Sequence, residues 1–199
     1  MSLDVAILGF LSERPRSGYD LKTRCFDDAT KDFWTADQAQ IYRTLERLQG
    51  AKLVTATRKR QVGKPDRKVY AITDLGRLTL TAWLAEPHPL PAPRDAFLLQ
   101  LYFAGELTDD QLSARLAERR SLHQTRLDDL RDRALRTAQG SDAPMRVVAL
   151  RDAAFSGAIA LERAAIDWLD DCLEGLKAGS LPPLAKGEEQ RPLFGPTTA

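Results

Sequence analysis

Residues 86–95 read EPHPLPAPRD and hold four prolines within ten positions. Proline has no backbone N–H and its ring blocks a continuing helix, so such a segment favours an extended spacer. We therefore expect two modules, at residues 1–86 and 95–177, joined by a linker at 87–94. More prolines and glycines predict an irregular or disordered tail over residues 178–199.

Charge is divided unevenly between the two modules. The 199-residue chain has a formal net charge of only +1. Residues 1–86 hold 15 basic and 11 acidic residues, a net charge of +4, whereas the remainder holds 14 and 17, a net charge of −3. This asymmetry indicates that only the first module attracts anions.

The first module predicts three helices followed by a β-hairpin and a fourth helix. Apolar spacing predicts helices over residues 3–12, 18–29, 36–49 and 74–85, and strands over residues 53–57 and 68–72. We expect Ser17 to cap the second helix, Thr35 and Gln38 to form the capping box of the third, and Gly50 to cap its end. Trp34 is expected in the core.

The segment KLVTATRKRQVGKPDRK, residues 52–68, carries a net charge of +6. It covers the first strand, the turn and the start of the second strand of the predicted hairpin. Two interpretations stay open, a solvated loop or a surface that meets a polyanion. Strand position alone leaves open how many of Arg58, Lys59 and Arg60 face such a partner.

Three helices followed by a basic hairpin are typical of a winged helix-turn-helix, whose third helix enters the major groove of DNA. Gln and Arg side chains form bidentate pairs with base edges, which favours Gln38, Gln40 and Arg43 as reading residues. Lys64, Arg67 and Lys68 of the hairpin are expected on phosphates. Tyr19 and Tyr42 either pack in the core or donate a hydroxyl to a phosphate.

The second module is expected to be entirely helical. Helices are predicted over residues 94–104, 109–137 and 144–177, the second opened by a Thr108–Gln111 capping box. The two long helices favour an antiparallel pair that needs a partner chain to cover its remaining apolar stripe. Five aromatic residues either line a pocket or form a dimer core: Phe97, Tyr102, Phe103, Phe155 and Trp168.

The chain offers no catalytic pattern. Its two histidines, His88 and His123, and two cysteines, Cys25 and Cys172, lie apart, and the common phosphate-loop and zinc motifs are missing from the sequence. We expect no enzyme activity, no metal and no cofactor. No apolar run has the 18 or more residues typical of a membrane span, and no signal peptide is recognisable, so a cytoplasmic protein is expected.

Three segments resemble the PadR family of bacterial transcriptional regulators. They are SGYDL at residues 17–21, WTADQAQIYRTLERLQGAKLV at 34–54, and RKVYAITDLGR at 67–77. DAFLLQLYFAGELTDDQL at residues 95–112, followed by two long helices, resembles the C-terminal domain of the Vir-type subgroup. One departure is that family members commonly have Glu-Gly where this chain has Gly50-Ala51-Lys52.

The resemblance implies a mainly α protein with a small β-hairpin, a winged helix-turn-helix followed by a long-helix dimerisation domain. It implies a homodimer that binds double-stranded DNA at a pseudo-palindromic operator, acts as a repressor, and is released by a small-molecule effector at an unknown site. It places Tyr19, Gln38, Gln40, Tyr42 and Arg43 near DNA. Two alternatives remain, a helical protein–protein adaptor with a solvated hairpin, and a small-molecule-binding protein or enzyme.

Overall fold

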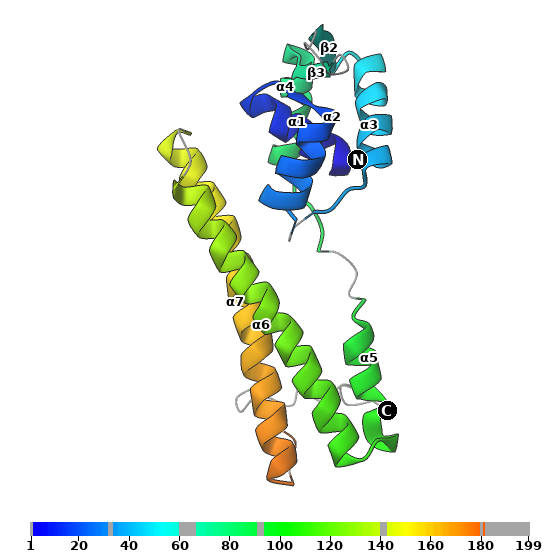
Figure 1. The fold of residues 1–199 in the computed structure, drawn as a ribbon, viewed down its shortest axis with the longest axis vertical. Helices are drawn as coiled ribbons and strands as arrows, with labels where there is room; N and C mark the ends of the chain where they lie inside the picture. Colours follow the sequence, from blue (N-terminus) through cyan, green and yellow to red (C-terminus); the bar gives the residue numbers. More distant parts are fainter. Residues whose placement is uncertain are drawn as a thin grey trace, which may run out of the picture. The chain divides into compact units, whose positions relative to one another are not determined.

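The computed structural model describes residues 2–31, 34–59, 67–90, 94–139, 143–179 and 181. The chain divides into two compact units, Met1–Ala92 and Pro93–Ala199. The first unit contains helices and a small sheet, and the second contains helices in its described residues (Figure 1). The predicted tail lies outside the described residues except at its start.

Helices α1 (Ser2–Glu13), η1 (Leu21–Ala29) and α3 (Gln38–Gly50) bury one apolar face each in the first unit. The predicted stripes are confirmed, because Leu8 and Leu11 of α1, Leu21 of η1, and Ile41 and Leu45 of α3 are all buried. Strands β2 (Val54–Lys59) and β3 (Arg67–Ile72) add Val54 and Tyr70 to the same core. This unit therefore closes its core with its own elements.

The second helical segment differs from the expected α-helix. It begins as α2 (Gly18–Asp20) and continues as the π-helix η1. Ser17 caps it as predicted: Ser17 Oγ accepts from Asp20 N at 3.1 Å, and Asp20 Oδ2 accepts from Ser17 N at 3.1 Å. A π-helix is rare and buries one side as an α-helix does, so apolar spacing did not distinguish the two.

The start of α3 corrects a prediction. Its N-cap is Asp37, whose Oδ1 accepts from Gln40 N at 2.7 Å while Gln40 Oε1 accepts from Asp37 N at 3.3 Å. Thr35 stays outside the helix, so the Thr35–Gln38 capping box is wrong. The same sequence holds two overlapping boxes, and the carboxylate two residues later forms the one observed. Trp34 is 42% exposed, so its expected place in the core is also wrong.

The end of α3 lies one residue later than predicted. Gly50 is part of the helix, and Lys52 adopts the left-handed conformation with φ of 60°. Lys52 N donates to Gln49 O at 3.0 Å and Leu53 N donates to Leu48 O at 2.9 Å, which is the pattern of a Schellman motif. A lysine therefore occupies the position that usually takes glycine, and the predicted Gly50 cap is wrong.

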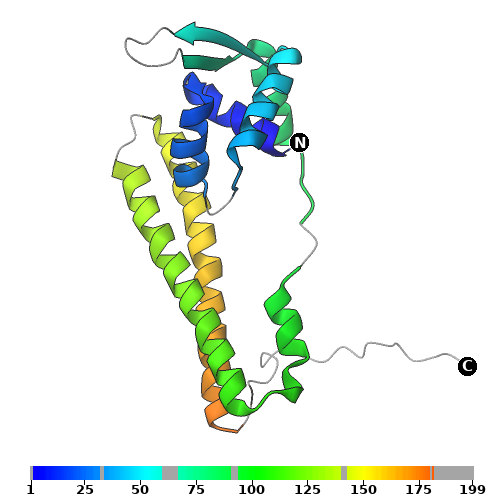
Figure 2. The same ribbon diagram turned by 45° about the vertical axis from the view of Figure 1, so that its right-hand side comes forward.

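A three-stranded antiparallel sheet follows, in the order β1–β3–β2. The predicted hairpin is present as β2 and β3, longer than expected towards the tip, which lies outside the described residues (Figure 2). The short strand β1 (Arg16–Ser17) was not predicted, because two residues give no periodic signal. Of the two residues that the sequence offers as the cap of α4 (Asp74–Ala85), Thr73 and Asp74, it is Thr73 that caps the helix, by accepting from Gly76 N at 3.0 Å.

In the second unit, α6 (Asp109–Gln139) and α7 (Met145–Lys177) lie side by side (Figures 1 and 2). They have 31 and 33 residues, which corresponds to roughly 45–50 Å each. The Thr108–Gln111 capping box is confirmed, since Gln111 N donates to Thr108 Oγ1 at 3.3 Å and Thr108 N donates to Gln111 Oε1 at 3.0 Å. Pro144 directly precedes α7 instead of occupying its first turn.

Helix α5 (Ala96–Tyr102) is shorter than the predicted helix over 94–104 because Asp95 caps it and the 3-10 turn η2 (Ala104–Glu106) follows. Near it, Leu112 and Leu116 of α6 pack with Leu169 and Cys172 of α7. Further along the pair, His123 Nδ1 lies 2.6 Å from Oε2 of the buried carboxylate of Glu162. His123 therefore lies partly buried at the contact between α6 and α7.

A surface ion pair also joins α6 to α7. Arg120 Nη2 donates to Asp170 Oδ2 at 2.9 Å, and a second hydrogen bond joins Arg120 Nε to the other carboxylate oxygen. These hydrogen bonds hold the pKa of the Asp170 carboxyl below its usual value and raise the pKa of the Arg120 guanidinium. Because both side chains are largely solvated, the pair orients the helices more than it stabilises them.

Candidate nucleic-acid interface

The first two turns of α3 present the predicted reading residues to solvent. Gln38, Gln40, Tyr42 and Arg43 are all exposed, while Ile41 and Leu45 between them are buried. The helix therefore has one face in the core and one face free, which is the arrangement that a recognition helix requires.

Arg43 and Arg47 occupy successive turns of α3 but differ in their surroundings. Arg47 donates to both carboxylate oxygens of Asp4 of α1, and these bonds raise the pKa of its guanidinium. Within the described part of the chain, Arg43 has no hydrogen-bond or ion-pair partner. Arg43 is thus the arginine on α3 whose guanidinium fork is available to a base edge, whereas Arg47 already ties α3 to α1.

Tyr42 packs by its ring and keeps an exposed edge. A Cβ atom placed on Gly18 would lie 2.6 Å from Tyr42 Cε1, so the ring rests directly on the backbone at the start of α2. Tyr42 as a whole is nevertheless 38% exposed. The ring therefore packs without being enclosed in the core, and donation of its hydroxyl to a phosphate stays a prediction. Gly18 is required because any side chain there would displace this ring.

Tyr19 and Gln40 differ in how available their side chains are for a contact with DNA. Tyr19 is 64% exposed, so it is not a core residue. Gln40 is exposed, but its side-chain oxygen accepts the Asp37 N–H of the capping box. A base contact by that oxygen would have to compete with the cap, so Gln40 is less available for reading than Gln38, the first residue of α3.

The hairpin places like charges opposite one another at its outer end. Arg58 pairs with Lys68, and Lys59 pairs with Arg67, as Cα partners in the β2–β3 ladder. Directly opposite residues share a face of the sheet and consecutive residues alternate, so the two pairs lie on opposite faces. Arg58 and Lys59 therefore cannot both face one surface. Arg60 and Lys64 lie outside the described residues.

Arg67 and Lys68 also differ in how free they are. Arg67 forms an ion pair with Asp20 at the start of the second helical segment. Lys68 is exposed, and its Nζ lies 5.1 Å from the ring centre of Tyr70. The β2–β3 hairpin, called the wing from here on, therefore presents Arg58, Lys59 and Lys68 as exposed cations. Its Arg67 also joins the hairpin to α2.

Sequence reasoning missed a hollow beside α3. It has a volume of about 610 Å³, and its lining includes Trp34, Gln40, Arg43 and Arg47. The exposure of Trp34 at this hollow was missed because an aromatic residue next to a helix start usually packs inward. Its spacing from Arg43 carries no signal, since a loop separates them.

Catalytic chemistry finds no support in the described residues. They contain no group of three or more His, Cys, Asp or Glu side chains that could hold a metal ion. Burial raises the pKa of the Cys25 thiol to about 11, and burial also raises the pKa of Cys172, so both thiols are poor nucleophiles. Among the same residues, no helix is both long and apolar enough to cross a membrane.

The helices, exposed α3 face and basic hairpin define a winged helix-turn-helix, a class of DNA-binding domain. Residues 7–82 match the model of the Transcriptional regulator PadR-like family, and residues 93–177 match that of the Virulence activator alpha C-term family. The probable transcriptional regulator Rv1176c of Mycobacterium tuberculosis is 37% identical over 187 residues, which cover 89% of this chain and 98% of that protein. The chain belongs to the PadR-like family of transcriptional regulators.

Other relatives agree with this assignment. The negative transcriptional regulator PadR of Bacillus subtilis is 34% identical over 129 residues, covering 64% of this chain and 70% of that protein. A crystal structure of Bacillus subtilis PadR with operator DNA is similar at a TM-score of 0.78 and 28% identity, over 88% of this chain and 99% of that one. A crystal structure of Bacillus subtilis PadR with p-coumaric acid is similar at a TM-score of 0.71 and 27% identity, over 88% of this chain and 95% of that one.

The predicted family and fold class are therefore confirmed, including the winged helix-turn-helix and the helical C-terminal module. The family consists of transcriptional regulators and not of enzymes, which agrees with the prediction on catalysis. The individual DNA-contacting residues stay predictions.

Proposed function

We propose that this chain is a sequence-specific repressor that binds a pseudo-palindromic operator as a homodimer. The observation that carries the proposal is the like-charge pairing at the outer end of the hairpin, where Arg58 and Lys68 are Cα partners and share one face of the sheet. Like charges directly opposite one another destabilise a hairpin. A duplex phosphate backbone beside that face would turn this repulsion into affinity.

Specificity would come from α3. Arg43 has no competing partner among the described residues, and Gln38 stands exposed one turn earlier. Both side chains form bidentate pairs with purine edges, Arg with guanine and Gln with adenine. The wing lysines and arginines would hold the register of α3 through phosphates, which carry no sequence information themselves.

The second unit supports the homodimer. On α7, an exposed stripe follows the alternating spacing of four and three that is typical of a coiled coil, at Leu150, Ala154, Gly157, Leu161, Ala164 and Trp168. A separate seam of α7, which includes Phe155, Ile166 and Leu169, is buried. Two chains that share the exposed stripe would cover it. Among the aromatic residues, Phe155 is buried, while Tyr102 and Phe103 are 81% and 67% exposed.

The proposals that this chain represses transcription and is released from DNA by an effector are supported by its relatives. The Bacillus subtilis protein is named a negative regulator, and it has been crystallised with operator DNA and with p-coumaric acid. We assign the same sign of regulation to this chain, with a small-molecule effector and a cytoplasmic location.

Binding to the chain's own promoter tests this function. Fluorescence anisotropy would compare a labelled promoter duplex with a shuffled duplex of equal length and composition, at several salt concentrations. We expect specific binding at least about 1,000-fold tighter than nonspecific binding, with affinity that falls steeply with salt. Equal affinity for the two duplexes would contradict the proposal. In that case, capture of a protein partner by the second unit would favour the helical adaptor.

A further inference from the structure

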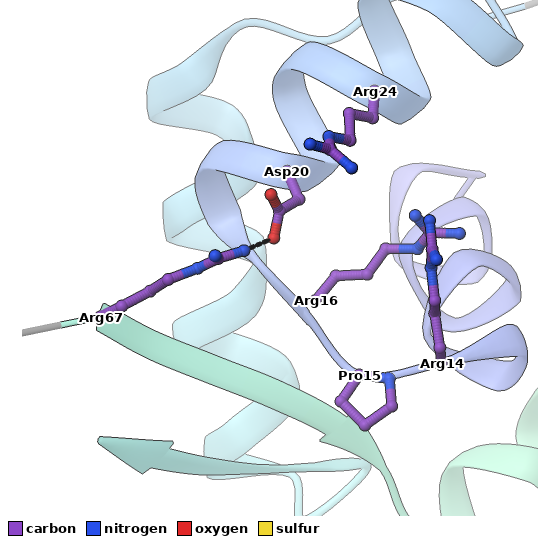
Figure 3. A pocket seen from close by; sticks show the side chains of 6 residues that line it. All are labelled: Arg14, Pro15, Arg16, Asp20, Arg24 and Arg67. Atoms are coloured by element: carbon purple, nitrogen blue, oxygen red, sulfur yellow. Dashed lines mark hydrogen bonds and ion pairs between the residues drawn. The ribbon is translucent and has the colours of Figure 1, made fainter. Parts of the chain in front are cut away.

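A hollow of about 230 Å³ lies in the first unit, where the segment from Arg14 to Arg24 meets the start of β3. Its lining consists of Arg14, Pro15, Arg16, Asp20, Arg24 and Arg67, so four of the six lining residues are arginines. They come from the α1–β1 connection, β1, α2, η1 and β3. In Figure 3, Arg14, Arg16 and Arg24 lie to one side of Asp20 and Arg67 lies to the other. Segments distant in sequence therefore bring like charges to one opening.

Two of these arginines are already compensated. Arg16 is buried, and its Nη2 lies 2.7 Å from Glu13 Oε2 while its Nε donates to Phe10 O at 3.2 Å. Arg67 pairs with Asp20. Asp20 Oδ2 also accepts from Ser17 N at 3.1 Å and from Ser17 Oγ at 2.9 Å. Three donors therefore converge on Asp20 Oδ2, and the carboxylate in the lining of the hollow already has Arg67 as its ion-pair partner.

Arg14 and Arg24 are the remaining cations. Neither has a hydrogen-bond or ion-pair partner within the part of the chain that the structure describes, and both are exposed at the hollow. A side-chain acid would normally accompany arginines held this close to one another. The two uncompensated guanidinium groups beside Arg16 point to an external anion as the missing partner.

We propose that this hollow binds a phosphate group, with Arg14 and Arg24 as its principal ligands. A guanidinium fork matches the oxygen spacing of phosphate, and several forks that approach from different segments suit a tetrahedral, multiply charged oxyanion better than a planar monocarboxylate. The volume admits a phosphate or pyrophosphate group. The phosphate comes either from a free phosphorylated molecule or from the backbone of bound DNA.

The position of Asp20 gives the site a consequence for the wing. The Asp20 carboxylate completes the capping box of α2 by accepting from Ser17 N, and it holds β3 through Arg67. A phosphate bound beside Asp20 would compete with it for Arg67 and so alter how β3 is tied to α2. This part rests on the proposed DNA-binding function, whereas phosphate binding itself does not.

Isothermal titration calorimetry of the full-length protein with inorganic pyrophosphate, at constant ionic strength, tests the site. The variant is R14A/R24A, which removes two side chains that make no hydrogen bond or ion pair within the described part of the chain, and R14Q/R24Q is a second version. R146A/R163A, which removes two exposed arginines of α7, is the charge-matched control. We expect the unaltered protein to bind pyrophosphate saturably with a Kd below about 1 mM. Binding should be at least tenfold weaker in both double variants, and the Kd of the control should stay within twofold of that of the unaltered protein. Acetate should give no saturable binding.

The source of the phosphate is separated by repeating the DNA salt titration with the same proteins. If DNA supplies it, R14A/R24A lowers DNA affinity and flattens the salt slope by about 0.9 for each lost contact. If a free molecule supplies it, DNA affinity stays unchanged while pyrophosphate binding is lost. The proposal is overturned if the variants bind pyrophosphate as the unaltered protein does, or if neither pyrophosphate nor DNA binding depends on these arginines. If the protein binds pyrophosphate through Arg14 and Arg24 but does not prefer its promoter, only the proposed function is contradicted.

Discussion

The two units of this chain cover their apolar residues to different degrees. In the first unit, helices α1, η1 and α3 and the hairpin close one core, in which Ile7, Leu8 and Ile41 are fully buried. In the second unit, α6 and α7 are longer, yet Leu150 and Leu161 of α7 are 60% and 74% exposed. The first unit therefore closes a core with its own elements, although Leu78 of α4 is 69% exposed, while α7 of the second unit has exposed leucines that a second chain would cover in the proposed homodimer.

The largest expected effect comes from Leu161→Glu on the exposed stripe of α7. A buried, unpaired carboxylate in the proposed dimer seam is costly, so we expect monomers. Two linked heads bind together far more tightly than one alone. Operator affinity should therefore fall at least about 100-fold. Multi-angle light scattering would give the mass, and anisotropy the affinity. Ser156→Glu, exposed on α7 away from the stripe, is the control, and a dimeric L161E protein would remove this account of the second unit.

Arg43→Ala tests the exposed face of α3 in the first unit. We expect a loss of roughly 1–3 kcal/mol in promoter binding and weaker discrimination against shuffled DNA, because a bidentate base contact disappears. Arg47→Ala, one turn later on the same helix, should instead lower the free energy of unfolding by about 1 kcal/mol or less through loss of its pair with Asp4. If R47A and R43A reduce discrimination equally, Arg43 has no special role.

Lys68→Gln separates folding from binding in the wing. Removing this charge relieves the repulsion with Arg58, so the free energy of unfolding should stay the same or rise by a few tenths of a kcal/mol, roughly. DNA affinity should fall for all sequences alike, and the salt slope should flatten by about 1. Lys177→Gln in the second unit is the control. A loss of discrimination without a change in slope would contradict a phosphate contact.

Lys52→Gly addresses the end of α3 and should have a smaller effect. Lys52 has a φ of 60°, which glycine adopts without steric cost. We expect the free energy of unfolding to rise by about 0.5–1 kcal/mol, offset in part by greater freedom of the unfolded chain. Urea denaturation would measure it. A decrease in stability would mean that the lysine side chain contributes a contact that offsets the strain.

The last prediction concerns Cys25 and pH. Burial raises the pKa of this thiol from 9.0 to about 11 in the folded chain. Between pH 9 and 11 the unfolded chain loses this proton first, so stability should fall as pH rises, by at most about 1.4 kcal/mol per pH unit from this group. Urea denaturation at pH 8 and pH 10, with Cys25→Ala for comparison, would test it. An equal decline in the variant would assign the pH dependence to other groups.

Sequence patterns predicted most of the fold because most elements have strong periodic signals. The stripe of Leu8 and Leu11, the Ser17 cap and the Thr108–Gln111 box need only local spacing. The predicted start of α3 was wrong because Thr35 and Asp37 each begin a possible capping box. Which of the two boxes forms depends on packing with the surrounding chain. The π-helix η1 and the left-handed Lys52 depend on tertiary packing that no local pattern reports.

The candidate site was predicted only as a set of residue types. Spacing identified the polar face of α3. It did not show that Arg47 is tied to Asp4 while Arg43 has no partner among the described residues, because Arg47 and Asp4 are 43 positions apart. It also did not show that Arg67 pairs with Asp20, or that arginines from four segments surround that carboxylate. Likewise, spacing predicted that the long helices keep an uncovered apolar stripe, but it did not show which residues of α7 form that stripe.

Hydroxyl-radical footprinting of the protein on its own promoter tests the central claim most directly, with the protein-to-duplex ratio measured by light scattering. The account predicts two chains per duplex and two protected segments about one helical turn apart, 10–10.5 bp from centre to centre, or a multiple of that spacing. One chain protecting a single segment, or protection no stronger than on shuffled DNA, would contradict it.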